Sequence, residues 1–253
     1  DGGRIGEPAA TGISEDLAKW HHRMGRLKTG TPPRVDGGTV DWNALEPQPG
    51  DDPPRPFSLA TDSLPLRQVS CHITETTAAT HHIVKTNLHL TARYGGQSQA
   101  TGPRYCPSIE DKIVKFPHHE RHTIFVEPEG LETPEIYLNG LSTSLPEPQQ
   151  LEMVRSLPGF RDAVLARPGY AIEYDFVDPR CLGLDLQSRT VRGLYLAGQI
   201  NGTTGYEEAA ALGFWAGVNA ARALQDLPLF HVERHAGYLG VLVDDLITRG
   251  VTE

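Results

Sequence analysis

Apolar and polar positions follow two different periods along this chain, and the periods predict strands mixed with helices. Alternation of apolar and polar residues is typical of strands, whereas apolar residues three and four positions apart are typical of helices. The segments expected as strands are 25–34, 68–74, 123–127, 135–138, 169–176 and 192–197. The segments expected as helices are 14–19, 78–90, 148–157, 207–224 and 238–248. This order of elements predicts an α/β fold with an inserted α+β region.

Turn-forming residues separate these elements. Ser14 is expected to cap the first helix, and Pro32 with Pro33 to end the first strand. The segment 41–65 is rich in Pro and Asp and predicts a long loop or insertion. The 253 residues are enough for one large domain or two ordinary ones. No run approaches the ~18 apolar residues of a membrane-spanning helix, and no signal-peptide pattern opens the chain, so no membrane association is expected.

Charge is unevenly distributed along the chain. The net charge is −9, which argues against a nucleic-acid-binding protein when the chain is taken as a whole. Between His81 and His122, however, there are six Lys or Arg residues against three acidic residues, and six of the eleven histidines lie there. A local basic patch can steer an anion to one face of an acidic protein. A solvated surface that binds no ligand is an equally good interpretation of this basic patch.

The positions of cysteine and histidine exclude several kinds of site. The three cysteines, far apart and without a CxxC pair, are Cys71, Cys106 and Cys181. Their number and spacing argue against a disulfide scaffold, a zinc ribbon and a redox-active dithiol, and favour a reducing compartment. Adjacent histidines form three pairs, which are His21–His22, His81–His82 and His118–His119. Adjacent residues do not share a helix face, so the three pairs predict no metal site.

A glycine-rich segment near the C-terminus is the most informative part of the chain. An apolar run ends at Ala197, a glycine-rich loop follows, and a helix is expected to begin near Tyr206 or Glu207. The amides at such a helix start favour negative charge, and glycines let a planar ligand approach the backbone. Small residues at spacing four, which permit close packing on a sheet or cofactor, are Ala209, Gly213, Gly217 and Ala221. A tight helix–strand crossover without a ligand is the alternative.

The arrangement of strand, glycine-rich loop and small-residue helix resembles the second flavin-binding segment of two-dinucleotide flavoproteins. Five longer motifs make the resemblance more specific. They are GRLKTGTPPR at 25–34, GPRYCPSIEDK at 102–112, PGYAIEYD at 168–175, AGQINGTTGYEEAAA at 197–211 and YLGVLVDDL at 238–246. In this order they resemble the motifs of the MnmG (GidA) family, flavoproteins that modify tRNA, and the resemblance covers nearly the whole chain.

The resemblance implies part of a glutathione-reductase-like FAD-binding Rossmann-type domain with an inserted α+β domain. The domains it implies are 1–35 in the FAD-binding domain, 36–165 as the inserted region facing NADH and tRNA, 166–225 as the second flavin-binding segment, and 226–253 as the start of a C-terminal helical region. The residues it implies for cofactor binding are Gly198, Gln199, Asn201, Gly202, Thr203, Thr204, Gly205, Tyr206 and Glu207.

The resemblance also implies an activity. Family members use FAD and NADH with a folate-linked one-carbon unit, and act with an MnmE-type GTPase. Together they add a carboxymethylaminomethyl-type group to C5 of the wobble uridine of certain tRNAs. We therefore expect tRNA and the GTPase as partners, a homodimer, and a cytoplasmic location in a bacterium or a mitochondrial one in a eukaryote.

Three residues of the second motif are the expected catalytic and tRNA-binding residues. Cys106 is the candidate nucleophile, because Pro107 as a first helical residue and a Ser108–Asp111 capping pair would place its thiol at a helix start, where a thiolate is stabilised. An inert buried thiol, or another family cysteine upstream, is the alternative. Arg104 and Lys112 match family positions associated with tRNA binding, through phosphate contacts.

Three departures from the family pattern separate the possible readings. The family's GxGxxG phosphate loop and C-terminal helical domain are not found in this sequence, as expected if it resembles the central portion of a longer family member, and Leu90 stands where an arginine is usual. The first alternative is another FAD/NADH oxidoreductase of the superfamily, such as the folate-dependent tRNA uracil methyltransferase. The second is a non-catalytic fragment that binds RNA or a partner. The Cys106 motif and GRLKTGTPPR favour the modification enzyme.

Overall fold

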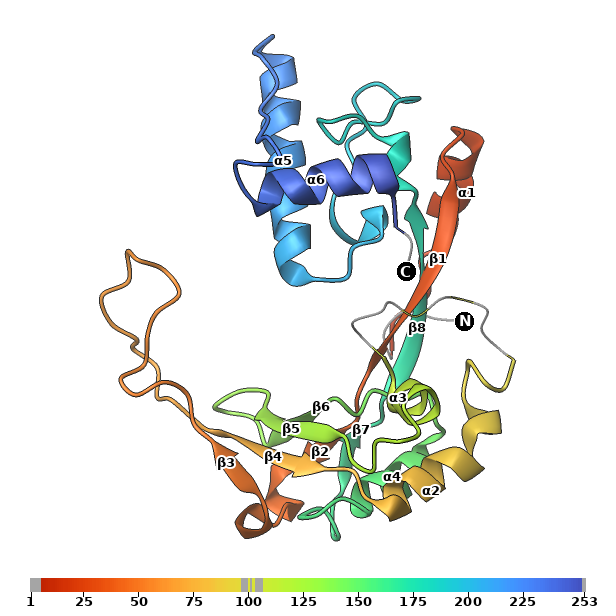
Figure 1. The fold of residues 1–253 in the computed structure, drawn as a ribbon, viewed down its shortest axis with the longest axis vertical. Helices are drawn as coiled ribbons and strands as arrows, with labels where there is room; N and C mark the ends of the chain where they lie inside the picture. The colour runs from red at the N-terminus through yellow and green to blue at the C-terminus, as the bar shows by residue number, and fades with distance from the viewer. Residues whose placement is uncertain (1–5, 97–99, 101, 103–106, 252–253) are drawn as a thin grey trace. The chain divides into compact units, whose positions relative to one another are not determined.

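The computed structural model describes residues 6–96, 100, 102 and 107–251, which divide into two compact units (Figure 1). Unit 1 consists of the described residues up to Thr29, of Ala100 and Gly102, and of the chain from Ile172 onward. Unit 2 consists of the described residues of 30–96 and 107–171.

Unit 2 is built on a six-stranded antiparallel sheet with the order β3-β4-β5-β6-β2-β7. Its strands are β2 (Arg34–Asp36), β3 (Glu46–Gln48), β4 (Cys71–Glu75), β5 (Thr123–Pro128), β6 (Glu135–Asn139) and β7 (Leu165–Arg167). Its helices are α2 (Ala78–Thr86), α3 (Ile109–Lys115) and α4 (Glu147–Arg155), with 3-10 turns at Gly37–Thr39, Trp42–Ala44 and Leu88–Leu90. An antiparallel sheet with helices packed beside it is an α+β arrangement, which the sequence predicts for this region.

The core of unit 2 lies between this sheet and its helices. Ile124 and Val126 on β5 are fully buried and alternate with more exposed neighbours, as a strand with one covered face requires. Helix α2 packs against α3 and α4, and Phe160, after α4, is fully buried in the same core. The segment between β3 and β4 has little regular structure and projects from the sheet (Figure 1), as its Pro and Asp content predicts.

Unit 1 combines a two-stranded sheet with helices. Its elements are α1 (Ile13–Lys19), β1 (Met24–Thr31), β8 (Tyr170–Val177), α5 (Tyr206–Leu224) and α6 (Tyr238–Arg249), with 3-10 turns at Pro179–Cys181 and Gly198–Asn201. Strands β1 and β8 pair with each other, and the last residues of β1 and the first of β8 belong to unit 2. Trp215 of α5 is fully buried in the core of unit 1, and its indole N–H donates to the carbonyl oxygen of Leu184 at 2.7 Å.

Two local predictions about unit 1 are wrong. The segment 192–197 is no strand, because Gly193 turns the chain with φ +83° and only Tyr195 pairs, in an isolated bridge with Gln187. Ser14 does not cap α1: Gly12, with φ +94°, precedes the helix and Ser14 lies inside its first turn. The other predicted helices and strands are present, with ends shifted by a few residues, and the helix predicted for 78–90 divides into α2 and a 3-10 turn.

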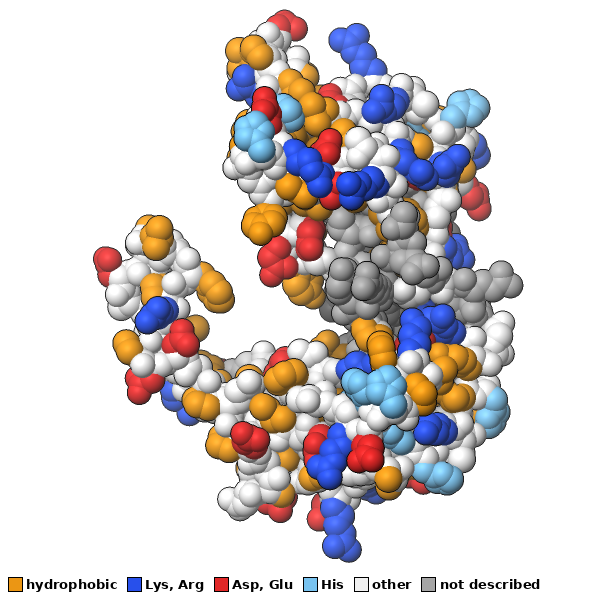
Figure 2. Space-filling model, viewed as in Figure 1, with side chains coloured by type: hydrophobic (Ala, Val, Ile, Leu, Met, Phe, Trp, Pro, Cys, Tyr) orange, Lys and Arg blue, Asp and Glu red, His pale blue; other side chains and the backbone are white. Residues whose placement is uncertain are grey.

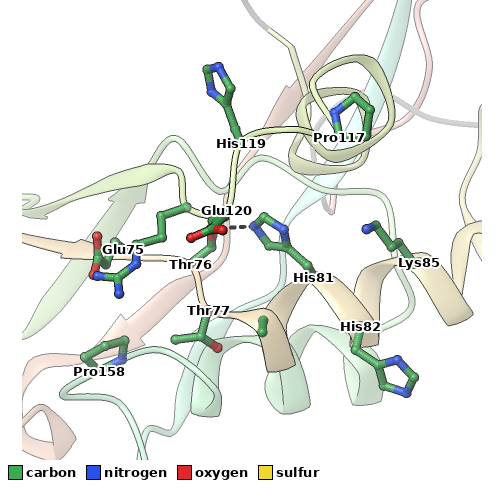
Figure 3. Close-up of a pocket in the computed structure, with 12 residues that line it drawn as sticks. Glu75, Thr76, Thr77, His81, His82, Lys85, Pro117, His119, Glu120 and Pro158 are labelled. Carbon is green, nitrogen blue, oxygen red and sulfur yellow. Dashed lines mark hydrogen bonds and ion pairs between the residues drawn. The ribbon is translucent and has the colours of Figure 1, made fainter.

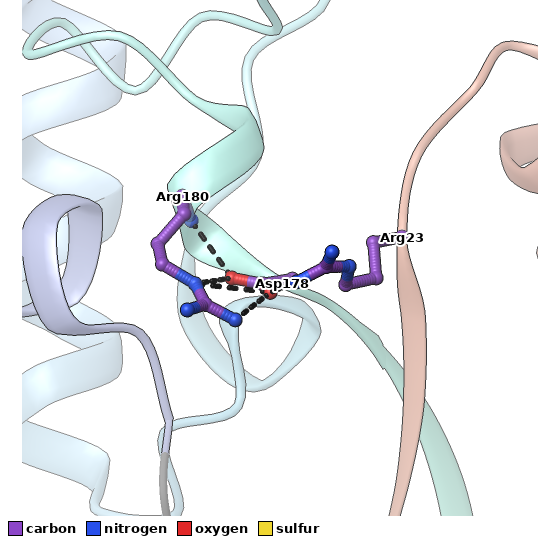
Figure 4. Close-up of polar contacts among 3 residues, drawn as sticks. All are labelled: Arg23, Asp178 and Arg180. Atoms are coloured by element: carbon purple, nitrogen blue, oxygen red, sulfur yellow. Dashed lines mark hydrogen bonds and ion pairs between the residues drawn. The ribbon is translucent and has the colours of Figure 1, made fainter.

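Asp178 connects the end of β8 to the strand beside it. Its carboxylate accepts from the backbone N–H of Arg180 at 3.1 Å and from the Arg180 guanidinium at 2.5 to 3.1 Å (Figure 4). Arg23 approaches the same carboxylate at 3.5 Å, and the backbone N–H of Asp178 donates to the Arg23 carbonyl oxygen. These donors, those of Arg180 foremost, hold the pKa of the buried Asp178 below its usual value.

We expect the Asp178→Asn variant to lose about 2 kcal/mol of stability at neutral pH, as for hydrogen bonds to a buried charge. A depressed folded pKa contributes stability above the unfolded pKa of about 3.9, and this stability is lost as pH falls through the folded pKa. The difference between wild type and variant should therefore shrink below about pH 4. Urea unfolding between pH 3 and 7 measures it, with the exposed Asp51→Asn as control. A difference that stays constant with pH would contradict the assignment.

Candidate functional site

The glycine-rich segment forms a short, tightly turned connection into α5. Residues Gly198–Asn201 make a 3-10 turn, Gly202 follows in the left-handed conformation with φ +80°, and α5 begins at Tyr206. The predicted start of this helix is confirmed. Gly205 is the N-cap, and no side chain caps the helix. The amides of the first turn of α5 therefore have no side-chain acceptor at the cap, as a site for an electronegative ligand atom requires.

Two buried polar atoms in this loop have no partner within the described residues. Asn201 is fully buried; its amide nitrogen donates to the Leu196 carbonyl oxygen at 2.8 Å, while its Oδ1 accepts no hydrogen bond. The hydroxyl of Thr203 is buried and unpaired in the same way. Leaving such groups unpaired costs about 1–3 kcal/mol each. An unpaired acceptor and an unpaired hydroxyl in one loop fit a ligand with N–H and O–H groups, as a flavin and its ribityl chain have.

The two glycines of the loop have different roles. A Cβ at Gly202 would lie 2.6 Å from a methyl carbon of Val251 and 3.0 Å from the ring of Phe176, so the packing of unit 1 itself requires this glycine. At Gly205, φ is −87° and a Cβ would meet only the flexible carboxylate of Glu208 within 3 Å. Position 205 is therefore the one where a larger side chain is compatible with the fold.

The small-residue face of α5 is only partly packed. Ala209 lies against Gly198, whose Cβ position is 3.5 Å from the Ala209 methyl group. Gly213 and Gly217 are exposed, and no described atom lies within 4 Å of a Cβ at either position. The close packing that the small residues permit is thus present at the start of the helix and open farther along it.

Helix α3 holds the part of the second motif that the structure describes. Ser108 is its N-cap, and its hydroxyl oxygen accepts from the amide of Asp111 at 3.2 Å, which confirms the predicted capping pair. Pro107 lies before the cap rather than at the first helical position, because the helix starts at Ile109. Cys106 and Arg104 lie outside the described residues.

Lys112 has a clear structural contact. Its ammonium group donates to the carbonyl oxygen of Gly140 at 2.8 Å and the residue is half-buried. It thereby fixes the turn after β6, where Gly140 has φ +99°. A role in tRNA binding stays a prediction for this residue.

Sequence reasoning missed the buried acids of α3. Asp111 is 2% exposed, accepts from the Tyr94 hydroxyl at 2.9 Å and forms an ion pair with Arg93 at 3.2 Å. Burial and the bond to Asp111 raise the pKa of Tyr94 to about 12, so this phenol stays a donor. Glu110, also buried, accepts from the Thr143 hydroxyl at 2.6 Å. Glu110 and Asp111 therefore hold the first turn of α3 in place. From composition alone, these acidic residues would be expected at the surface.

The remaining thiols and histidines form no metal site in the part of the chain that the structure describes: it holds no group of three His, Cys, Asp or Glu residues placed to bind an ion. Burial, and secondarily the charge of Glu127, raise the pKa of the Cys71 thiol. His22 is buried, with one ring nitrogen 2.8 Å from the Ser188 hydroxyl and the other 3.0 Å from the Leu17 carbonyl oxygen.

Within the described ranges, no helix is both long and apolar enough to cross a membrane.

The fold is that of part of a glutathione-reductase-like FAD-binding domain with an inserted α+β domain. The chain belongs to the glucose inhibited division protein A (GidA) family, whose model matches residues 1–228. Crystal forms I and II of Aquifex aeolicus GidA match it with TM-scores of 0.91 and 0.90, at 54% and 52% identity. These matches cover 100% of this chain and 43% and 41% of theirs, and they confirm the predicted fold class.

Curated relatives have the same family relationship. The proteins named tRNA uridine 5-carboxymethylaminomethyl modification enzyme MnmG from Granulibacter bethesdensis and Aquifex aeolicus are 54% and 55% identical to this chain. Both matches cover 100% of the chain, but only 40% and 42% of the relatives. The chain thus spans about two fifths of the length of the relatives it matches.

Proposed function

We propose that the full-length protein containing this chain is a flavin-dependent enzyme that modifies C5 of the wobble uridine of tRNA, using FAD and NADH with an MnmE-type GTPase as partner. The observation that carries the proposal is 54% identity to a protein named as an MnmG modification enzyme over the whole of this chain. The orphaned polar atoms of the loop add independent support for a bound ligand.

The loop and the start of α5 would hold the flavin. Asn201 Oδ1 and the Thr203 hydroxyl would pair with polar groups of the cofactor, and the first-turn amides of α5 would face its electronegative edge. The other members of the set are Gly198, Gln199, Gly202, Thr204, Gly205, Tyr206 and Glu207. When bound, FAD supplies the redox chemistry, while these residues bind and orient it and stabilise negative charge at the helix start.

Cys106 would supply the covalent step. Its thiolate adds to C6 of the uracil ring, the electrons of the C5–C6 double bond move to C5 and the adjacent carbonyl, and C5 then attacks an electrophilic, folate-derived one-carbon unit. Loss of the C5 proton expels the thiolate and restores the double bond. Helix α3, which follows Cys106 in the sequence, is capped by Ser108, and Asp111 in its first turn forms an ion pair with Arg93.

The remaining proposals follow the family. Arg104 and Lys112 would contact tRNA phosphates, and the full-length protein would be a homodimer in the cytoplasm or mitochondrion. Its domains would be 1–35, 36–165, 166–225 and 226–253, as the resemblance implies.

Modified nucleosides and bound flavin test the proposed function together. Full-length protein should carry FAD, seen as absorption at about 450 nm. Incubated with its GTPase partner, NADH, a folate one-carbon donor and unmodified tRNA, it should give a C5-aminomethyl-type uridine by mass spectrometry. A C5-methyl product would identify the methyltransferase alternative instead. Protein that binds tRNA but neither flavin nor NADH would be the non-catalytic alternative.

The contribution of Arg104 to tRNA binding has its own test. We expect the Arg104→Ala variant to bind tRNA more weakly, with the slope of log affinity against log salt reduced by up to about one unit, because one phosphate contact is lost. Filter binding between low and moderate salt measures the slope, with the exposed Arg55→Ala as control. Unchanged affinity and slope would assign Arg104 to structure.

A further inference from the structure

Unit 2 contains a pocket of about 680 Å³ along one face of α2, and none of the residues assigned to flavin or tRNA lines it. Four residues of α2 at helical spacing line it, Ala78, His81, His82 and Lys85. The opposite wall comes from the end of β4 and from the segment between α3 and β5, with Glu75, His119, Glu120 and Arg121. Figure 2 shows histidines gathered over the part of unit 2 that carries α2 and α3.

Two groups that can carry positive charge lie together on α2. In Figure 3, the ammonium of Lys85 turns toward the ring of His81, whereas His82 points away from both. His81 is 8% exposed, and its Nε2 is 2.8 Å from the hydroxyl oxygen of Thr76. Lys85 is exposed and makes no ion pair with another described residue.

The acidic residues that line the pocket do not form an ion pair with Lys85. Glu75 is already paired with Arg121. Glu120 is exposed on the segment before β5. Behind His81, the ring of His122 stacks at 5.4 Å between centroids, and the buried Nε2 of His122 has no hydrogen-bond partner among the described residues. The imidazole pair thus lies in a setting where a nearby anion would stabilise added protons.

We propose that this pocket binds a phosphate ester, with the phosphate held between the Lys85 ammonium and the His81 imidazole. The volume lies in the range of pockets for nucleotide-sized ligands, about 300–1,000 Å³. Phosphate accepts hydrogen bonds from both groups and compensates the charge of Lys85. The phosphate comes either from a small nucleotide or from an RNA backbone, and the two sources share this chemistry.

Anion binding here is coupled to pH. Burial, and secondarily Lys85, lower the pKa of His81, and burial with the neighbouring His81, Lys112 and His119 lowers that of His122 to about 4. The other charged or titratable groups around His81 are Glu75, His82, Glu120 and Arg121. A bound anion favours the imidazolium form of His81, so its pKa rises on binding and affinity increases as pH falls.

Equilibrium dialysis of AMP against the full-length, cofactor-loaded protein tests the site. We expect Lys85→Gln to weaken AMP binding about tenfold, as for one charge-assisted hydrogen bond. Lys115→Gln is the matched control, because Lys115 lies in the last turn of α3 as Lys85 does in α2, is exposed, and lines no part of the pocket. Equal AMP affinity of Lys85→Gln and wild type would overturn the proposal. Binding of AMP at a different nucleotide site would produce such equal affinities.

Sulfate tests the pH coupling, because its charge is constant between pH 6 and 8. Competition of sulfate with AMP should strengthen several-fold toward pH 6 in wild type and lose this dependence in His81→Gln. An oligoribonucleotide without terminal phosphates distinguishes the two sources. Displacement of AMP from the Lys85-dependent site assigns the phosphate to RNA, and retention of AMP assigns it to a small nucleotide. A pH dependence identical in His81→Gln and wild type would overturn the role of His81.

Discussion

The Gly205→Val variant of the full-length protein should purify without its flavin, while the wild type carries FAD in stoichiometric amount. Gly205 is the N-cap of α5, directly before the amides proposed to face the flavin. Its φ of −87° suits valine, and a side chain there would displace only the carboxylate of Glu208. The variant is therefore expected to fold, and its branched side chain to occupy the space that the isoalloxazine needs. Absorbance of released flavin per protein chain measures the effect.

Gly237→Val is the matched control for this variant. Gly237 is the N-cap glycine of α6, its φ of 171° is extended backbone, and no atom of a described residue lies within 4 Å of its Cβ position. We expect this variant to keep its flavin and the circular dichroism spectrum of the wild type. Gly202→Val would not serve, because strain at φ +80° and contact with Val251 would disturb the fold itself. Stoichiometric FAD in Gly205→Val would exclude the loop as the flavin site.

The Cys106→Ser variant should keep its flavin spectrum and bind tRNA, yet modify it at least about two orders of magnitude more slowly. A serine hydroxyl is hardly ionised at neutral pH, whereas a thiol close to a helix start can be a thiolate. The readout is the modified nucleoside per tRNA in single-turnover conditions. Cys181→Ser is the control, since Cys181 is a half-buried free thiol of unit 1. A wild-type rate in Cys106→Ser would move the covalent step to another cysteine of the full-length protein.

Alkylation gives an independent measure of the same thiol. A short pulse of iodoacetamide near neutral pH should label Cys106 before Cys71 and Cys181, and bound tRNA should protect it. The raised pKa of Cys71 keeps that thiol protonated and slow to react. Peptide mapping ranks the three thiols, and the slowest labelling at Cys106 would make it a packing residue.

Much of the fold could be predicted from local sequence patterns. Alternation at β5 and β6 follows from one covered face, with Ile124 and Val126 buried on one strand and Ile136 and Leu138 on the next. Helix α5 is predicted nearly to the residue, because its glycine cap and apolar face both lie in the local sequence. The apolar run before it is no strand, since pairing needs a neighbouring strand, and only Gln187 pairs with Tyr195 there.

The candidate sites were predictable to a different degree. The loop residues around Asn201 are found through their glycines and the family motif. That Asn201 Oδ1 lies unpaired depends on burial by distant segments, which no local pattern contains. The basic window from His81 to His122 contains both histidines that stack in unit 2, but the sequence alone does not show that they stack. The pairing of Glu75 with Arg121 across the pocket requires the antiparallel register of β4 and β5, which no local pattern contains.

The two ends of unit 2 lie against each other. A Cβ at Gly169 would lie 2.6 Å from the Thr31 carbonyl oxygen, and one at Gly30 would lie 3.6 Å from that of Tyr170. A region whose entry and exit touch can be gained, lost or exchanged as one piece in evolution without rerouting the host chain. Gly169 is then required in any exchanged region, because any larger residue there would force the entering and leaving strands apart. Recombination of this region between relatives is accordingly expected to preserve the glycine while the rest of the insert diverges.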